Sequence, residues 1–197
     1  MLTSPVMDAA LQLPDPMTLE EFLVWDAPEG AFWQLVDGEP CAMAPASPAH
    51  GVIQGEVGSL LRNHLTEAGG RCRMVVNPGV KLGVRSDRNY RIPGLAVTCT
   101  PLIPGEPMLT DPVVLVEILS PSNQAETWTN GWAYTTISGV QEILVIRTAT
   151  IGAQLLRRNP DGTWPDLPQS IGDGDVALDS IGFRAPLAAL YAGTWLA

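Results

Sequence analysis

The chain has 197 residues, of which 46% are hydrophobic, and a formal net charge of −10. This size and apolar content suit one domain with a substantial core and exclude a largely disordered chain. No apolar run reaches the ~20 residues that a membrane-spanning helix needs, and the N-terminal stretch lacks the basic and apolar regions of a secretory signal. We therefore expect a loose arm over residues 1–16, a single domain over 17–197 and no membrane partner.

The three cysteines lie far apart, with no CxxC pair and no zinc-ligand spacing. A sparse and odd number of cysteines predicts free, buried thiols rather than a disulfide framework. The composition is therefore typical of a cytoplasmic protein.

The charge is distributed unevenly. Residues 71–91 carry six of the eleven basic residues and one acid, Asp87, so this segment has a net charge of +5 and the remainder −15. The acidic remainder argues against broad nucleic-acid binding, because such binding depends on neutralising phosphates. The basic segment either steers an anionic ligand or forms a solvated hairpin face. The residues that we predict to contact nucleic acid are Lys81, Arg85, Arg88 and Arg91.

The N-terminal third predicts a short helix, a hairpin and a long helix. Thr18 and Glu21 form a capping box ahead of a helix that ends near Trp25. Asp37-Gly38 separates two apolar runs and predicts a β-hairpin with strands over 31–36 and 39–43. Ser47-Pro48 then begins the main helix, which Gly69-Gly70 ends.

The rest of the chain alternates between strands and helices. The run over 112–120 is almost continuously apolar and β-branched, which is typical of a central strand covered on both faces. The other expected elements are strands near 72–76, 80–84, 95–97, 142–147, 151–158 and 176–178, and helices over 124–136 and 185–191. This order predicts an α/β or α+β fold, with a mixed β-sheet flanked by helices.

Glu117 is the most informative residue, since it interrupts the apolar central strand close to its end. An unpaired buried carboxylate costs several kcal/mol, so such a residue needs a partner or a metal. Glu117 is either part of a site at the strand end or a structural glutamate on an edge or in an ion pair.

Several segments together resemble the Uma2 family of endonucleases, the DUF820 group of the PD-(D/E)XK nuclease superfamily. The matching segments are WQLVDGEPCAMAPASPAH (33–50), RIPGLAV (91–97), VEILSPSN (116–123), WAYTTISGVQEILVI (132–146), LLRRNPDGTWP (155–165) and IGFRAPLAALY (181–191). The resemblance implies a restriction-endonuclease-like core with an N-terminal hairpin. It also implies an endonuclease that hydrolyses nucleic-acid phosphodiesters, DNA in particular, with Mg²⁺ or Mn²⁺.

The chain departs from the family pattern at the residues that carry this chemistry. Glu117 matches the family glutamate that binds the metal, but Gly94 follows Pro93 where the family has aspartate. Leu119 stands where the superfamily has lysine, and Asn130 where the family often carries the relocated lysine. We therefore expect weakened or absent catalysis, and the alternative is a non-catalytic module that binds nucleic acid or protein.

Three further features complete this picture. Gln34 replaces an auxiliary glutamate of the family, and the acids that could substitute for the missing ones are Asp37, Glu39 and Glu126. His50, at the start of the main helix, either assists at the site or hydrogen-bonds the helix terminus. Tryptophans and prolines near the surface suit a homodimer.

Overall fold

A six-stranded mixed sheet forms the centre of the molecule. The structure is a computed structural model, and it describes residues 15–120 and 124–197. The expected N-terminal arm therefore lies almost entirely outside the described residues. The strand order is β10-β9-β8-β7-β6-β3. The bounds are β3 Arg73–Val76, β6 Leu95–Thr98, β7 Pro112–Leu119, β8 Glu142–Arg147, β9 Ala153–Arg157 and β10 Gln169–Ile171.

The central strand is β7, as its apolar run predicts. It pairs with β8 in parallel and with β6 antiparallel, so the sheet is mixed. Leu115 and Val116 are fully buried on opposite faces of β7, because the sheet is covered on both sides. The expected mixed sheet flanked by helices is confirmed.

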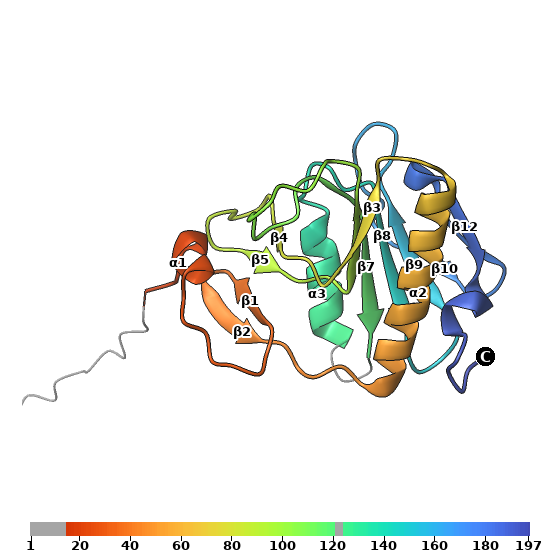
Figure 1. Cartoon of the computed structure of the whole chain (residues 1–197), viewed down its shortest axis with the longest axis horizontal. Coiled ribbons are helices and arrows are strands. Elements are labelled where there is room, and N and C mark those ends of the chain that lie inside the picture. Colours follow the sequence, from red (N-terminus) through yellow and green to blue (C-terminus); the bar gives the residue numbers. More distant parts are fainter. Residues whose placement is uncertain (1–14, 121–123) are drawn as a thin grey trace, which may run out of the picture.

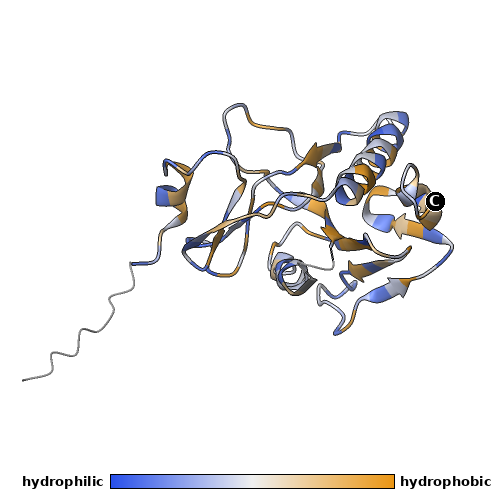
Figure 2. Cartoon of the chain, turned by 90° about the horizontal axis from the view of Figure 1, so that it is seen from below, coloured by the Kyte–Doolittle hydropathy of each residue, from blue (hydrophilic) through white to orange (hydrophobic). Residues whose placement is uncertain are grey.

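Each face of the central sheet packs against a helix (Figures 1 and 2). On one face lie α2 (Pro48–Glu67) and a C-terminal hairpin of β11 (Asp175–Leu178) and β12 (Phe183–Pro186). On the other face lies α3 (Gln124–Tyr134). Ser47 caps α2 through its side chain, and the apolar stripe of this helix, which includes Ile53, packs on the sheet.

A second, smaller sheet has four strands in the order β2-β1-β5-β4. Its strands are β1 Trp33–Val36, β2 Glu39–Ala42, β4 Val80–Lys81 and β5 Tyr90–Arg91. The predicted hairpin is confirmed, and Asp37 and Gly38 at its turn both have positive φ, as a tight two-residue turn requires. The predicted capping box begins α1 (Leu19–Leu23), which packs on this sheet through Leu19 and Phe22.

Two expectations are wrong. The segment 185–191 is not one helix: it completes β12 and then forms a 3-10 helix, Leu187–Tyr191. Its run FRAP alternates buried and exposed residues with period two, which is the period of a strand. The cysteines are not all free either, since Cys72 and Cys99 form a disulfide across β3 and β6, and only Cys41 is free.

The disulfide follows from strand pairing that spacing along the chain could not reveal. Arg73 lies opposite Thr98, which brings the neighbouring cysteines together. Because disulfides are rare in the cytosol, the cysteines no longer support a cytoplasmic location, which stays a prediction. None of the helices in the described ranges has the length and apolar character to cross a membrane.

Candidate active site

Glu117 lies where β7 passes beneath α3, and its carboxylate is held from two sides. The side chain is half-buried, and the Tyr134 hydroxyl at the end of α3 donates a hydrogen bond of 2.6 Å to its Oε1. The backbone amide of Gly94, next to β6, also hydrogen-bonds the carboxylate. The central sheet therefore places Glu117 in the interior, in contact with the position where the family has aspartate.

This setting changes the acidity of both side chains. Burial raises the pKa of Glu117 from 4.5 to about 7, although the hydrogen bonds from Tyr134 and Gly94 act in the opposite direction. The negative charge of Glu126 adds to the increase. Burial and the nearby Glu117 also raise the pKa of Tyr134, so its hydroxyl remains a donor at neutral pH. A carboxyl group with this pKa can accept or release a proton near neutrality.

The raised pKa predicts how stability depends on pH. Between pH 4.5 and about 7 the folded protein binds more protons at Glu117 than the unfolded chain does. Its contribution is therefore complete at low pH and is lost as the pH rises through 7. We expect Glu117→Gln to gain stability relative to wild type by up to about 3 kcal/mol between pH 5 and 8. Urea unfolding at several pH values measures this, and a pH-independent difference would contradict the buried site.

Gly94 is fixed through its backbone. Its carbonyl accepts hydrogen bonds from the backbone amide of Asn77 (3.0 Å) and from Nε2 of Gln54 on α2 (2.7 Å). A Cβ atom at this position would lie 3.3 Å from the Val116 carbonyl oxygen and 3.8 Å from Gln54 Nε2. A side chain at position 94 therefore requires a shift of only a few tenths of an ångström.

The Gln54 and Asn77 contacts were not predicted from the sequence. The two side chains also hydrogen-bond each other, over 2.7 Å between Gln54 Nε2 and Asn77 Oδ1. The sequence does mark both positions: Gln54 is a polar residue beside the core residue Ile53, and Asn77 begins the turn before Pro78. Neither signal reveals that the two side chains meet at Gly94.

Asn130 and Arg91 form a second part of the site. Arg91 is buried, and its Nε donates to Asn130 Oδ1 over 2.9 Å, while its guanidinium also donates to the Leu35 carbonyl. Burial lowers the pKa of Arg91, and its charge in turn acts to lower the pKa of Tyr134. Arg91 is therefore an interior cation beside the site, and it does not lie on an exposed basic face.

Gln34 connects the small sheet to this region. It is buried, its Oε1 accepts from the backbone amide of Ile92 (3.1 Å), and its Nε2 lies 3.4 Å from Glu126 Oε1. Glu126 lies on the first turn of α3, and its negative charge acts to raise the pKa of Glu117. Asp37 instead pairs with Arg85 at the hairpin turn.

His50 occupies the first turn of α2 but forms no hydrogen bond with Glu117. Its backbone amide donates to Ser47 Oγ (3.3 Å), which is the capping role. Its ring is half-buried, Nδ1 has no hydrogen-bond partner among the described residues, and burial lowers its pKa. A role for His50 at the site stays a prediction.

The other basic residues predicted to contact nucleic acid are exposed, unlike Arg91. Arg85 forms an ion pair of 2.9 Å with Asp37, and Arg88 lies 3.7 Å from Asp87. Lys81 is exposed on β4. Binding of nucleic acid by these residues stays a prediction, with Arg91 unable to reach a ligand at the surface.

The side chains present do not fit a resident divalent metal ion. Mg²⁺ and Mn²⁺ bind through several oxygen ligands, carboxylates above all. Within residues 15–120 and 124–197, no group of three or more His, Cys, Asp or Glu side chains could hold a metal. Glu117 is the single carboxylate of the family pattern that remains, and it already accepts two hydrogen bonds.

The fold of this chain is also found in a solved structure of another protein. It matches the crystal structure of "a putative nuclease belonging to DUF820" from Anabaena variabilis ATCC 29413 with a TM-score of 0.73, over 92% of this chain and 100% of that chain. The sequence identity of 19% makes this a likeness of fold alone. An uncharacterized protein of Synechocystis sp., slr1290, is 30% identical over 178 residues, which are 88% of this chain and 90% of that protein.

Residues 19–188 match the model of the Uma2 family, which is described as "Putative restriction endonuclease". The chain belongs to the Uma2 family, and the resemblance seen in its sequence is confirmed.

Proposed function

We propose that this protein is a metal-dependent endonuclease of the Uma2 family whose hydrolytic activity is strongly reduced. The observation that carries the proposal is Gly94, whose backbone amide hydrogen-bonds Glu117 where the family pattern has a second carboxylate. One carboxylate alone binds a divalent ion weakly, since such ions need several oxygen ligands.

Each of the remaining differences puts a neutral side chain where the family has a charged one. Asn130 accepts a hydrogen bond from Arg91 where the family often has lysine, and Gln34 is neutral where the family has an acid. Removing one preorganised electrostatic contact typically lowers a rate by about 10²–10³-fold. Together these replacements predict little turnover in the wild-type protein.

The test of this function is a plasmid-nicking assay with Mg²⁺ or Mn²⁺, with wild type beside Gly94→Asp. Higher activity in the variant supports a nuclease scaffold weakened at this position. Equal, measurable activity in both proteins would mean that another acid already completes the site. No activity in either, together with DNA binding, would favour a non-catalytic binding module.

Binding can be tested separately from cleavage. We propose that the exposed Arg85 and Arg88 contact phosphates. The double variant Arg85→Gln, Arg88→Gln should then bind DNA more weakly, and the slope of log binding constant against log salt concentration should become shallower by about one to two. Arg184→Gln, an exposed change on β12, is the matched control. Fluorescence anisotropy over a range of salt concentrations measures both effects, and an unchanged slope in the double variant would remove these arginines from the interface.

A further inference from the structure

The outer edge of β3 is a strand edge with free backbone groups. β3 is the last strand of the central sheet and pairs with β6 on one side only. The Asn77 amide donates to the Gly94 carbonyl, and alternation along an antiparallel pair then directs Arg73 and Val75 toward β6 as well. The amides and carbonyls of Met74 and Val76 therefore point away from the sheet, and none of them has a hydrogen-bond partner recorded among the described residues.

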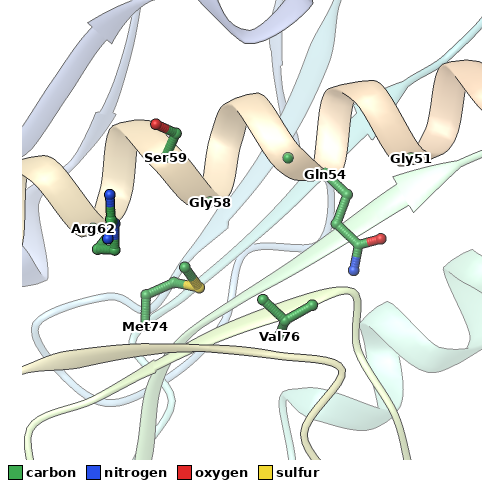
Figure 3. Close-up of a pocket in the computed structure, with 8 residues that line it drawn as sticks. Gly51, Gln54, Gly58, Ser59, Arg62, Met74 and Val76 are labelled. Atoms are coloured by element: carbon green, nitrogen blue, oxygen red, sulfur yellow. The ribbon is translucent and has the colours of Figure 1, made fainter.

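A groove lies on each side of this edge. The first, of about 400 Å³, runs between α2 and β3, and the Met74 and Val76 side chains line its floor (Figure 3). The second, of about 250 Å³, lies on the opposite face and is lined by Val75 and by the loop that contains Leu102 and Ile103. An added strand would direct successive side chains alternately into the two grooves.

Glycines make the first groove accessible. Gly51 and Gly55 line it from α2, and a Cβ atom at either position would meet no other atom within 4 Å. Glycine inside a helix costs about 1 kcal/mol relative to alanine, so these positions leave open space at the expense of helix stability. The Cys72–Cys99 disulfide at the start of β3 holds the edge in place on β6.

The cations at one end of the edge have no acidic partner. Arg62 lines the first groove on α2, and Arg71 and Arg73 are exposed where β3 begins. No ion pair within the described parts of the chain involves any of the three. An acidic group on a ligand would complement this end of the edge.

We propose that the β3 edge binds an extended acidic peptide segment of another protein, which adds to the central sheet as an antiparallel strand. Three apolar residues of the segment lie opposite Val76, Val75 and Met74, and two acidic residues follow. The first acid meets Arg73, and the second lies on the α2 face beside Arg62.

Other occupants fit this edge less well. A nucleic acid offers no row of backbone amides and carbonyls to match the edge, and Glu106 in the second groove would repel its phosphates. A second copy of this chain, paired antiparallel, would place Arg73 of each edge opposite the Val76–Asn77 end of the other and would give it no acidic partner.

The binding test uses the full chain and a short fluorescein-labelled peptide with the core Val-Ile-Val-Asp-Glu. Fluorescence polarisation is expected to show saturable binding, which is at least about tenfold weaker for the core Val-Ile-Val-Lys-Lys. A core with proline in place of the second valine, which lies opposite Met74, is expected to lose binding, because proline has no amide hydrogen to donate to the free Met74 carbonyl. Failure of the acidic peptide to bind, or equal binding of all three peptides, would overturn the proposal.

Gly55→Leu is the decisive variant, because leucine fills the first groove and is a better helix former than glycine. We expect it to weaken peptide binding at least about tenfold. Asn63→Leu adds the same side chain to an exposed site of α2 outside the groove and should leave binding unchanged. Arg62→Glu should reduce the preference for the acidic over the basic peptide, since Arg73 still meets the first acid.

Two results would assign the groove to a different occupant and overturn the proposal. One is a wild-type dimer in gel filtration that Gly55→Leu converts to a monomer. The other is an oligonucleotide that displaces the peptide from wild type and no longer binds to Gly55→Leu. Unchanged affinity of Gly55→Leu for the peptide would contradict the site itself.

Discussion

Gly94→Asp is expected to raise the Mg²⁺- or Mn²⁺-dependent rate of plasmid nicking by about 10²-fold or more. The change introduces a second carboxylate at the residue whose backbone amide already hydrogen-bonds Glu117. A divalent ion bound to both carboxylates would also favour the ionised form of Glu117, whose pKa burial raises to about 7. We therefore expect a larger gain than from any single change elsewhere in the site.

The fold can accept this substitution. The new Cβ atom would lie 3.3 Å from the Val116 carbonyl oxygen and within ordinary contact of Gln54, so a small backbone shift is sufficient. Gly94→Ala is the matched control, since it introduces the same Cβ atom without a carboxylate. If Gly94→Ala raised the nicking rate equally, the effect would come from backbone ordering and not from a new metal ligand.

Two further variants assign the ligands. Glu117→Gln combined with Gly94→Asp should return the rate to the wild-type level, because the remaining carboxylate is again alone. Glu126→Gln should leave the rate of Gly94→Asp within a few-fold of its value. Should wild type already cleave, loss of that activity in Glu126→Gln would identify this α3 acid as the substitute ligand, since its charge already acts on Glu117.

Regular periodicity and local chemistry made most of the fold predictable. The β-branched run of β7, the Ser47 cap of α2 and the Asp37-Gly38 turn each depend on neighbours in sequence, and each prediction matches the structure. The prediction for the C-terminal segment was wrong because short apolar runs such as IGFRAPLAALY suit a strand or a helix equally well. Tertiary pairing of β11 with β12 decided between them.

The site was predictable in part, for a similar reason. Glu117 stands out because a carboxylate in an apolar strand needs a partner, and the partner is Tyr134 at the end of α3. The burial of Arg91 could not be read from the sequence, because the five basic residues that precede it in the segment 71–91 suggested an exposed face. Its partners, Leu35 and Asn130, come from β1 and α3, far away along the chain.

Glu142→Ala is expected to lower the free energy of unfolding by about 3–5 kcal/mol, the largest effect on stability that we predict. Glu142 begins β8 and is almost fully buried. Its Oε1 accepts from Arg157 Nε (2.8 Å) and from the Asp179 amide (3.0 Å), and its Oε2 accepts from the amide (3.0 Å) and hydroxyl of Ser180. Removal of the carboxylate leaves these donors without their acceptor.

The position of these donors explains why one side chain matters so much. Asp179 and Ser180 begin the 3-10 turn between β11 and β12, so Glu142 fastens the C-terminal hairpin to the central sheet. Urea unfolding followed by circular dichroism measures the loss. Asp175→Ala is the control, because it breaks an exposed pair with Arg184 of 3.7 Å and should cost less than about 1 kcal/mol. A loss in Glu142→Ala as small as in the control would mean that water replaces the carboxylate, and that packing alone holds the hairpin on the sheet.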